Sequence, residues 1–260
     1  MPRFAANLSM MFTEWAFLDR FTAAAEAGFD AVEFLFPYEH AVDAVARALA
    51  DNGLTQALFN LPAGDFAAGE RGLAALSGRE ADFRASLATA LPYVEATGAR
   101  KIHCMSGHAD PADPAARATY AASLARAAET FGPLGVEILV EPINGRDMPG
   151  YFMNDFARAA ALIDELGLPN LRLQFDMYHR QILHGDVAMG FRALQPIVAH
   201  VQIASVPGRH EPDGEELRYE FLFGELDRLG YAGFVGCEYR PRAGTLEGLG
   251  WFAPWRKAVG

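Results

Sequence analysis

VEILVEPINGRDMPGYFMNDFARAAALIDELGLPNLRLQFD, residues 136–176, contains the repeating unit that decides the fold. A mostly apolar run at 136–141 precedes an alanine- and leucine-rich segment of helical period at 152–166, and a second strand-like run follows at 171–176. Gly167 separates the last two, and glycine is typical of a helix C-terminus because it adopts left-handed backbone angles without steric cost. A strand, a helix and a second strand in this order predict a parallel βαβ unit.

The same unit repeats along the whole chain. The strand-like runs are residues 3–9, 31–36, 54–59, 100–105, 136–141, 171–176, 198–203 and 233–238. The helix-like segments lie near residues 13–27, 39–51, 79–97, 114–131, 152–166, 187–194 and 217–229, with a weaker one after 245. Eight repeats favour a closed (β/α)8 TIM barrel over an open sheet, and the glycine-rich nucleotide-binding motifs of open folds are absent. Because no linker divides the chain, we expect one α/β barrel domain spanning residues 1–260.

Composition excludes several classes of protein. Hydrophobic residues make up 51% and charged residues 21%, which is typical of a globular chain and not of a disordered or fibrous one. The formal charge is −11 without any basic run, so we expect no nucleic-acid partner. No apolar run is long enough to cross a bilayer, so we expect no membrane association. Two cysteines do not make a disulfide framework, which indicates a reduced, cytoplasmic setting.

The last four predicted strands end with oxygen-bearing side chains. Glu141, Asp176, Gln202 and Glu238 follow one another at intervals of about one βα unit, so they should converge over the same end of the barrel. Three carboxylates and an amide would repel one another without a cation among them. Hard oxygen ligands without cysteine suit Mg²⁺ or Mn²⁺. Each acid alone could instead cap a loop or pair with an arginine, so the set is more informative than its members.

Other polar residues crowd the same rim. His179 and Arg209 follow the sixth and seventh strands, and an imidazole or guanidinium near a metal could hold a carboxylate or carbonyl oxygen of a substrate. Glu70 and Arg71 lie in a long loop after the third strand, and His103 lies near the end of the fourth. We treat these three as candidate substrate-binding residues, although loop-ordering salt bridges explain them equally well.

Some polar and aromatic residues have a simpler explanation. Glu33, Gln174 and His200 fall deeper in their strands, and we expect them to be satisfied polar residues inside the barrel. The tryptophans of GWFAPW, residues 250–255, should cover the barrel or a subunit contact, and a homo-oligomer is possible.

Seven segments carry a family resemblance that runs nearly end to end. They are RFAANLSM (3–10), VEFLFPY (32–38), NLPAGDFAAGERG (60–72), VEPIN (140–144), QFDMYH (174–179), HVQIASVPGRHEPDGEE (200–216) and VGCEYRP (235–241). In them the sequence resembles the hydroxypyruvate isomerase family of the xylose-isomerase-like barrel superfamily. These long segments are specific, whereas acids at strand ends alone would identify only the superfamily.

The resemblance implies a site and a reaction. It implies that Glu141, Asp176, Gln202 and Glu238 hold a divalent cation, and that Glu141 and Glu238 are the acid/base pair. The implied reaction interconverts hydroxypyruvate and tartronate semialdehyde (2-hydroxy-3-oxopropanoate) by proton transfer through an enediolate, in glyoxylate or other carbohydrate metabolism. In related ketose epimerases the counterparts of His179 and Arg209 contact substrate, so the resemblance implies the same role for these two residues.

Several alternatives stay open. A sister group, the 2-oxo-tetronate isomerases, resembles this chain more closely in RFAANLSMMFTE and PGRHEPD, whereas NLPAGD and EPIN are closer to hydroxypyruvate isomerase. A ketose 3-epimerase needs the same metal and the same two acids. An endonuclease of the superfamily would need more metals, more histidine ligands and a basic groove. A sugar-acid-binding sensor is the non-enzyme alternative, and the intact Glu141 and Glu238 speak against it.

Overall fold

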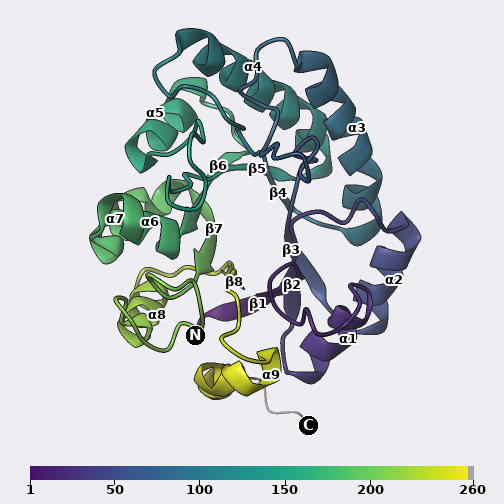
Figure 1. Cartoon of the computed structure of the whole chain (residues 1–260), viewed down its shortest axis with the longest axis vertical. Helices are drawn as coiled ribbons and strands as arrows, with labels where there is room; N and C mark the ends of the chain where they lie inside the picture. The colour runs from purple at the N-terminus through teal and green to yellow at the C-terminus, as the bar shows by residue number, and fades with distance from the viewer. Residues whose placement is uncertain (257–260) are drawn as a thin grey trace.

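The computed structural model, which describes residues 1–256, contains a closed parallel barrel of eight strands in chain order (Figure 1). The ring closes where β1 pairs with β8, with Arg3 opposite Phe234. The predicted (β/α)8 fold class is confirmed; the last four residues of the predicted domain lie outside the described residues. The strands are β1 (Arg3–Asn7), β2 (Ala31–Glu33), β3 (Thr55–Asn60), β4 (Lys101–His103), β5 (Glu137–Val140), β6 (Leu171–Asp176), β7 (Val198–Ile203) and β8 (Phe234–Cys237).

Helices surround the barrel on the outside (Figure 1). The α-helices are α1 (Asp19–Glu26), α2 (Val42–Asp51), α3 (Glu80–Thr97), α4 (Pro114–Phe131), α5 (Phe156–Leu166), α6 (Met177–His184), α7 (Val187–Leu194), α8 (Tyr219–Arg228) and α9 (Thr245–Gly248). Three 3₁₀ segments are η1 (Gly132–Leu134), η2 (Gln195–Ile197) and η3 (Leu249–Trp255). Within residues 1–256, no helix has both the length and the apolar character needed to cross a bilayer.

The helix boundaries differ from the sequence prediction at three places. Residues 13–18 form turns, so α1 is shorter than predicted. Helix α5 begins late, because the side chain of Asp155 caps it by accepting from the backbone N–H of Arg158. Helix α6 was not predicted: it starts directly after β6, where Asp176 accepts from the N–H groups of Tyr178 and His179. Asp176 is both the last residue of β6 and the N-cap of α6, so no loop separates the two elements. Hydrophobic periodicity alone therefore does not reveal where the helix begins.

Side chains facing the barrel interior change from apolar to polar along the strands. Near the strand starts, Ala5 and Ala31 form a small buried cluster packed against Phe234. Two residues further on the same faces come Asn7 and Glu33, because side chains alternate along a strand. The barrel therefore has an apolar lower layer and a polar layer below its C-terminal mouth.

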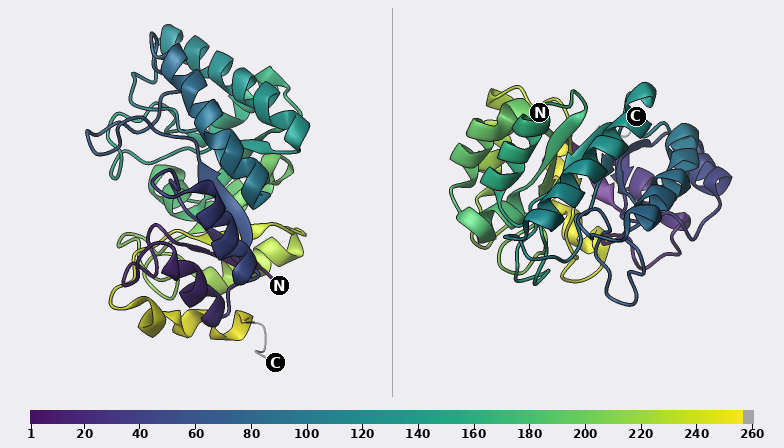
Figure 2. Two further views of the ribbon diagram at one scale, coloured as in Figure 1. Left: turned by 90° about the vertical axis from the view of Figure 1, so that its right-hand side faces the viewer. Right: turned by 90° about the horizontal axis from the view of Figure 1, so that it is seen from above.

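The larger apolar core lies between the strands and the helices, and the C-terminal segment completes it. Trp251 and Phe252 in η3 pack edge-on against Phe4 of β1, with ring centroids 5.2 and 5.8 Å apart. This confirms the prediction that the aromatic tail covers the barrel. Figure 2 shows the longer loops gathered at one end of the barrel, where the strands finish.

Candidate active site

A cavity of about 740 Å³ opens at the C-terminal ends of the strands. Barrel enzymes carry their active sites at this end, because the loops that follow the strands meet there. Its apolar wall comes from Leu35, Phe36, Phe66 and Met105. Its polar wall includes Ser9, Asn60, Arg71, His103, Glu141, Asp147, His179, Arg209, Glu238 and Arg240.

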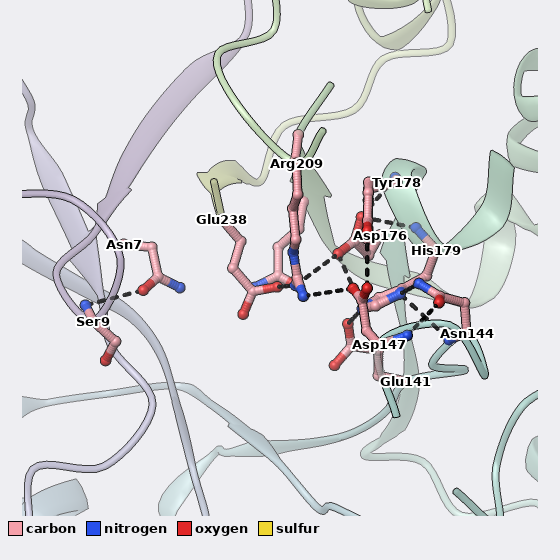
Figure 3. Close-up of polar contacts among 12 residues, drawn as sticks. Asn7, Ser9, Glu141, Asn144, Asp147, Asp176, Tyr178, His179, Arg209 and Glu238 are labelled. Atoms are coloured by element: carbon pink, nitrogen blue, oxygen red, sulfur yellow. Dashed lines mark hydrogen bonds and ion pairs between the residues drawn. The ribbon is translucent and has the colours of Figure 1, made fainter. Parts of the chain in front are cut away.

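Three predicted carboxylates meet at the floor of the mouth (Figure 3). Glu141 follows β5, Asp176 ends β6 and Glu238 follows β8, and all three are at least 95% buried. Together with His179 they offer ligand atoms that all lie within 4.8 Å of one another. The side chains of this carboxylate cluster (Glu141, Asp176 and Glu238) therefore converge as the strand spacing predicted.

Arg209 brings a positive charge to the carboxylate cluster from the loop after β7. Its Nη2 lies 2.6 Å from Oε2 of Glu238 and 4.0 Å from Oδ2 of Asp176. Its Nη1 lies 3.0 Å from Oδ2 of Asp147, and its guanidinium stands 4.9 Å from the ring centre of Tyr178. The backbone of Arg209 has φ of 57°, an uncommon conformation for a residue with a side chain, which indicates that its surroundings hold it there.

His179 is held in one orientation by the loop after β5. Its Nδ1 accepts from the backbone N–H of Asn144 at 3.3 Å and lies 2.6 Å from Nδ2 of the same residue. An Nδ1 that accepts leaves the proton of a neutral imidazole on Nε2. That nitrogen lies 3.7 Å from Oε1 of Glu141 and 3.6 Å from Oδ2 of Asp176. His179 thus turns its Nε2 toward the carboxylate cluster.

The acids of the cluster have strongly shifted pKa values. Burial raises the pKa of Glu141 well above its usual range, and the charges of Glu238 and Asp176 raise it further. Burial raises the pKa of Asp176 to about 6 and that of Glu238 to about 8, although Arg209 opposes both shifts. The charge of Glu33, deeper in the barrel, adds to all three. One guanidinium does not balance this much buried negative charge.

The histidines of the site have the opposite shift. Burial lowers the pKa of His179 well below its usual value, and the charge of Arg209 lowers it further. Burial, then the proximity of His200, lowers the pKa of His103 to about 3. Both imidazoles are therefore neutral at physiological pH and are available as hydrogen-bonding groups.

The cluster fits a hard divalent cation. Oε1 of Glu141 and Oδ2 of Asp176 are buried and have no hydrogen-bond partner within residues 1–256. An unpartnered buried carboxylate oxygen is costly, so native proteins rarely leave one without a ligand. Oxygen and imidazole donors without a thiolate are the set that Mg²⁺ or Mn²⁺ accepts.

Gln202 faces the barrel interior. It is level with Asp176 in the strand register and is 1% exposed. Its Nε2 donates to Oε1 of Glu33 at 2.8 Å, and its Oε1 accepts from Nε2 of Gln174 at 2.6 Å. Its role as a cation ligand stays a prediction.

The three remaining predicted residues separate in the structure. His103 lines the cavity with Nδ1 3.3 Å from Oε2 of Glu141. Arg71 also lines it and, among residues 1–256, has no carboxylate partner; its Nη1 donates to the carbonyls of Phe66 and Glu70. Glu70 is not among the described residues that line the cavity. It pairs with Arg79 at 2.6 Å, the loop-ordering alternative foreseen from the sequence.

Sequence reasoning missed two residues in the loop between β5 and α5. Asn144 orients His179, and its Oδ1 also accepts from the N–H groups of Arg146 and Asp147. Asp147 lines the cavity, pairs with Arg209 and accepts from the Tyr178 hydroxyl at 3.0 Å. Burial, then the charge of Asp147, raises the pKa of Tyr178 to about 12. The polar run NGRD directly after VEPI, at a strand end, was the available signal.

Comparison with known proteins gives consistent relatives over the whole chain. A family model described as "Xylose isomerase-like TIM barrel" matches residues 21–255. A Cupriavidus necator protein named 2-oxo-tetronate isomerase is 58% identical, with 98% of this chain and 99% of that protein covered. Hydroxypyruvate isomerase of Escherichia coli is 42% identical, with 98% and 100% covered. A crystal structure described as AP endonuclease, family 2, from Brucella melitensis has a TM-score of 0.97 at 51% identity, covering 99% of this chain and 100% of that one.

Proposed function

The chain belongs to the xylose isomerase-like TIM barrel family, and from this premise we propose that it is an isomerase that moves the carbonyl of a 2-oxo-tetronate to the neighbouring carbon. The resemblance to the hydroxypyruvate isomerases and their 2-oxo-tetronate sister group is confirmed. The sequence segments NLPAGD and EPIN favoured hydroxypyruvate as the substrate over a 2-oxo-tetronate. The identity of 58% against 42% over the same share of the chain supports the opposite order.

One observation carries the proposed chemistry: Glu141 and Glu238 are buried carboxylates directly after β5 and β8, with β6 and β7 between them. A carbonyl shift removes a proton from the hydroxyl-bearing carbon and adds one to the former carbonyl carbon, through an enediolate. The hydroxyl oxygen loses its proton in the same reaction, and the former carbonyl oxygen gains one. Two carboxylates that reach the same part of the mouth from different strands suit removal and return of these protons. We propose Glu141 and Glu238 for these roles.

A divalent cation, Mg²⁺ or Mn²⁺, is part of the proposal. Glu141, Asp176 and Glu238 would hold it, with Gln202 as the further ligand predicted from the sequence. When bound, it would supply Lewis-acid stabilisation of negative charge on the substrate oxygens. His179 Nε2, which carries the imidazole proton, is close enough to Glu141 and Asp176 to donate to a substrate oxygen in the same region.

The remaining polar residues suit an anionic sugar acid. Arg71 and Arg240 line the cavity, and no ion pair to a carboxylate is found for either within residues 1–256, so each can take the substrate carboxylate. Arg209 is held by Asp147 and Glu238 and can donate to a substrate oxygen over the mouth. Phe36, Phe66 and other apolar side chains around the cavity would keep water from the reacting carbons.

The proposed setting follows from charge and cysteine chemistry. The formal charge of −11 and a cavity floored by carboxylates support a small-molecule substrate over a nucleic acid. Cys104 and Cys237 are free and buried, which supports a reduced, cytoplasmic setting. The proposal includes a homo-oligomer.

The test is an isomerisation assay on the purified protein with a 2-oxo-tetronate and with hydroxypyruvate. Each is measured after chelation and again with Mg²⁺ or Mn²⁺ restored. We expect cation-dependent turnover of both, with a higher kcat/KM for the four-carbon acid. A higher kcat/KM for hydroxypyruvate would support the second candidate, which the 42% identical Escherichia coli enzyme favours. No turnover of either acid by folded, cation-loaded protein would contradict the proposal and favour the 3-epimerase or sensor alternative.

A further inference from the structure

Glu33 is a buried carboxylate at the centre of the barrel that the proposed chemistry does not use. It ends β2 and is 1% exposed. Its Oε1 accepts from Nδ2 of Asn7 at 2.9 Å and from Nε2 of Gln202 at 2.8 Å. Its Oε2 lies 2.6 Å from Nε2 of His200. Side chains from β1 and β7 therefore converge on one carboxylate below the mouth.

The Glu33 carboxylate determines whether Nε2 or Oε1 of the Gln202 amide faces it. A glutamine side chain can rotate its amide by 180° with almost no change in shape, exchanging its oxygen for its nitrogen. An ionised carboxylate only accepts hydrogen bonds, so the atom of Gln202 that contacts Glu33 must be Nε2. Oε1 of Gln202 then points away from Glu33, where Nε2 of Gln174 donates to it at 2.6 Å.

Only one of these two orientations is useful to a cation site. Mg²⁺ and Mn²⁺ accept an amide oxygen as a ligand, whereas the amide nitrogen carries two hydrogens and no free lone pair for them. Gln202 is level with Asp176 in the register, so its backbone lies beside that of one member of the carboxylate cluster. A partner that excludes the wrong orientation would therefore prepare Oε1 for ligation.

The chain also leaves room for Glu33 on the neighbouring strand. Gly236 is level with Gln202, at an inward-facing position of β8 between Phe234 and Glu238. A Cβ built on Gly236 would overlap the Glu33 carboxylate. Its φ is not positive, so the glycine is needed here for space and not for its backbone angles.

We propose that Glu33 is a positioning residue for the cation site, because it fixes the amide of Gln202 so that Oε1 is the atom offered as a ligand. The inference rests on the cation site of the proposed function. Gly236 is also required, because its lack of a side chain leaves the space that the Glu33 carboxylate occupies. Glu33 contacts neither the substrate nor the cation in this proposal; it acts through Gln202.

The experiment measures Mn²⁺ affinity by titration calorimetry, with the metal alone and no substrate. Glu33→Gln keeps the shape but can present either an oxygen or a nitrogen to Gln202, so both amide orientations become accessible. We expect the affinity of this variant to fall about 10- to 100-fold, the usual loss when an outer partner of a ligand is changed. Glu137→Gln is the matched control: Glu137 starts β5 and pairs with Lys101 and Arg172, so we expect no change.

Two further variants separate positioning from charge. Gly236→Ala keeps the charge of Glu33 but displaces its carboxylate, so it should weaken Mn²⁺ binding as well. In a Gln202→Ala background, Glu33→Gln should cost little further affinity, because the group it positions is gone. A cooperative thermal unfolding transition of each metal-free variant shows that it is folded. If Glu33→Gln does not fold, the Mn²⁺ affinity of Gly236→Ala tests the inference instead.

Three results would overturn the inference. They are native affinity in a folded Glu33→Gln variant, an undiminished effect of Glu33→Gln in the Gln202→Ala background, and native affinity in Gly236→Ala. Failure of the proposed function looks different: the native protein would bind Mn²⁺ and respond to these substitutions, yet isomerise neither acid. A native protein that binds no Mn²⁺ would overturn the cation site and this inference together.

Discussion

Glu238 and Arg209 form a largely buried ion pair at the barrel mouth, with Oε2 of the glutamate 2.6 Å from Nη2 of the arginine. The pair joins the end of β8 to the loop after β7. The same guanidinium reaches Asp147 in the loop after β5, so one side chain ties three segments around the cavity. A residue proposed for proton transfer is thereby held by a residue proposed for substrate contact.

Glu238→Gln should abolish most turnover and leave the fold intact. Glutamine keeps the size of the side chain but cannot take up a proton, and general acid–base groups typically contribute about 10²- to 10⁴-fold in rate. The measurement is kcat with each candidate acid, beside thermal unfolding of the same sample. Near-native turnover by the folded variant would contradict the assignment of Glu238.

Arg209→Met should destabilise the metal-free protein, because it leaves Glu238 and Asp147 without their cationic partner. Removing one member of a buried pair commonly costs about 3 kcal/mol. Added Mn²⁺ should recover part of this loss, since a cation would restore positive charge to the carboxylate cluster. Urea unfolding with and without Mn²⁺ measures both effects, and a variant as stable as native without metal would contradict this interpretation of the pair.

Asp147→Asn should act on substrate binding more than on stability. The side chain is partly exposed, so the fold does not depend on its burial. The neutral amide weakens the hold on Arg209, and we expect kcat/KM to fall by about tenfold, the value of roughly one charge-assisted hydrogen bond. Steady-state kinetics of the variant check this, with Asp110→Asn, elsewhere on the surface, as the control.

Chelation should lower the thermal unfolding temperature, and restoring Mg²⁺ or Mn²⁺ should raise it in a concentration-dependent way. A ligand that binds only the folded state stabilises it by about 2.7 kcal/mol at a hundredfold excess over its Kd. The measurement is a thermal unfolding series over cation concentration. Unchanged unfolding temperatures throughout would contradict the cation site.

A glutamate held by two arginines on the helical layer gives the expected pH dependence of stability. Glu225 accepts hydrogen bonds from Arg228 and Arg192, which lower its pKa from the ordinary 4.5 to about 2. A folded-state pKa below the unfolded one stabilises the protein above about pH 4.5, and this contribution is lost as the pH falls toward 2. Native protein should thus be more stable than Glu225→Gln at pH 7, with the gap closing over this range. Unfolding curves at several pH values test it, and a gap that does not depend on pH would contradict it.

Periodicity and strand-end chemistry in the sequence were enough to predict the barrel and its acidic centre. The alternation of apolar strands with helical segments depends on local backbone preference, which a sequence carries directly. The spacing of Glu141, Asp176 and Glu238 reflects the length of one βα unit, so their convergence followed once the strands closed. Helix α6 escaped prediction because its cap, Asp176, is also the last residue of a strand.

Contacts between distant segments could not be predicted in the same way. Glu70 and Arg71 are neighbours in the chain, yet one pairs with Arg79 outside the cavity wall and the other lines the cavity, because a loop's path decides where each side chain points. The importance of Asp147 became visible only when the loop after β5 was found beside Arg209. Glu33 was expected to be a satisfied polar residue, and the barrel closure made it the partner that orients Gln202.

By itself the sequence determined the eight-fold βα repeat, the family, and the acids that gather at one end of the barrel. These depend on periodicity and on residue type at strand ends, which are properties of short segments. The tertiary structure alone decided which side chains balance those acids and which way the Gln202 amide faces. Such contacts join residues far apart in the chain. Burial raises the free-energy cost of losing any one of them, because no water is available to replace a missing partner.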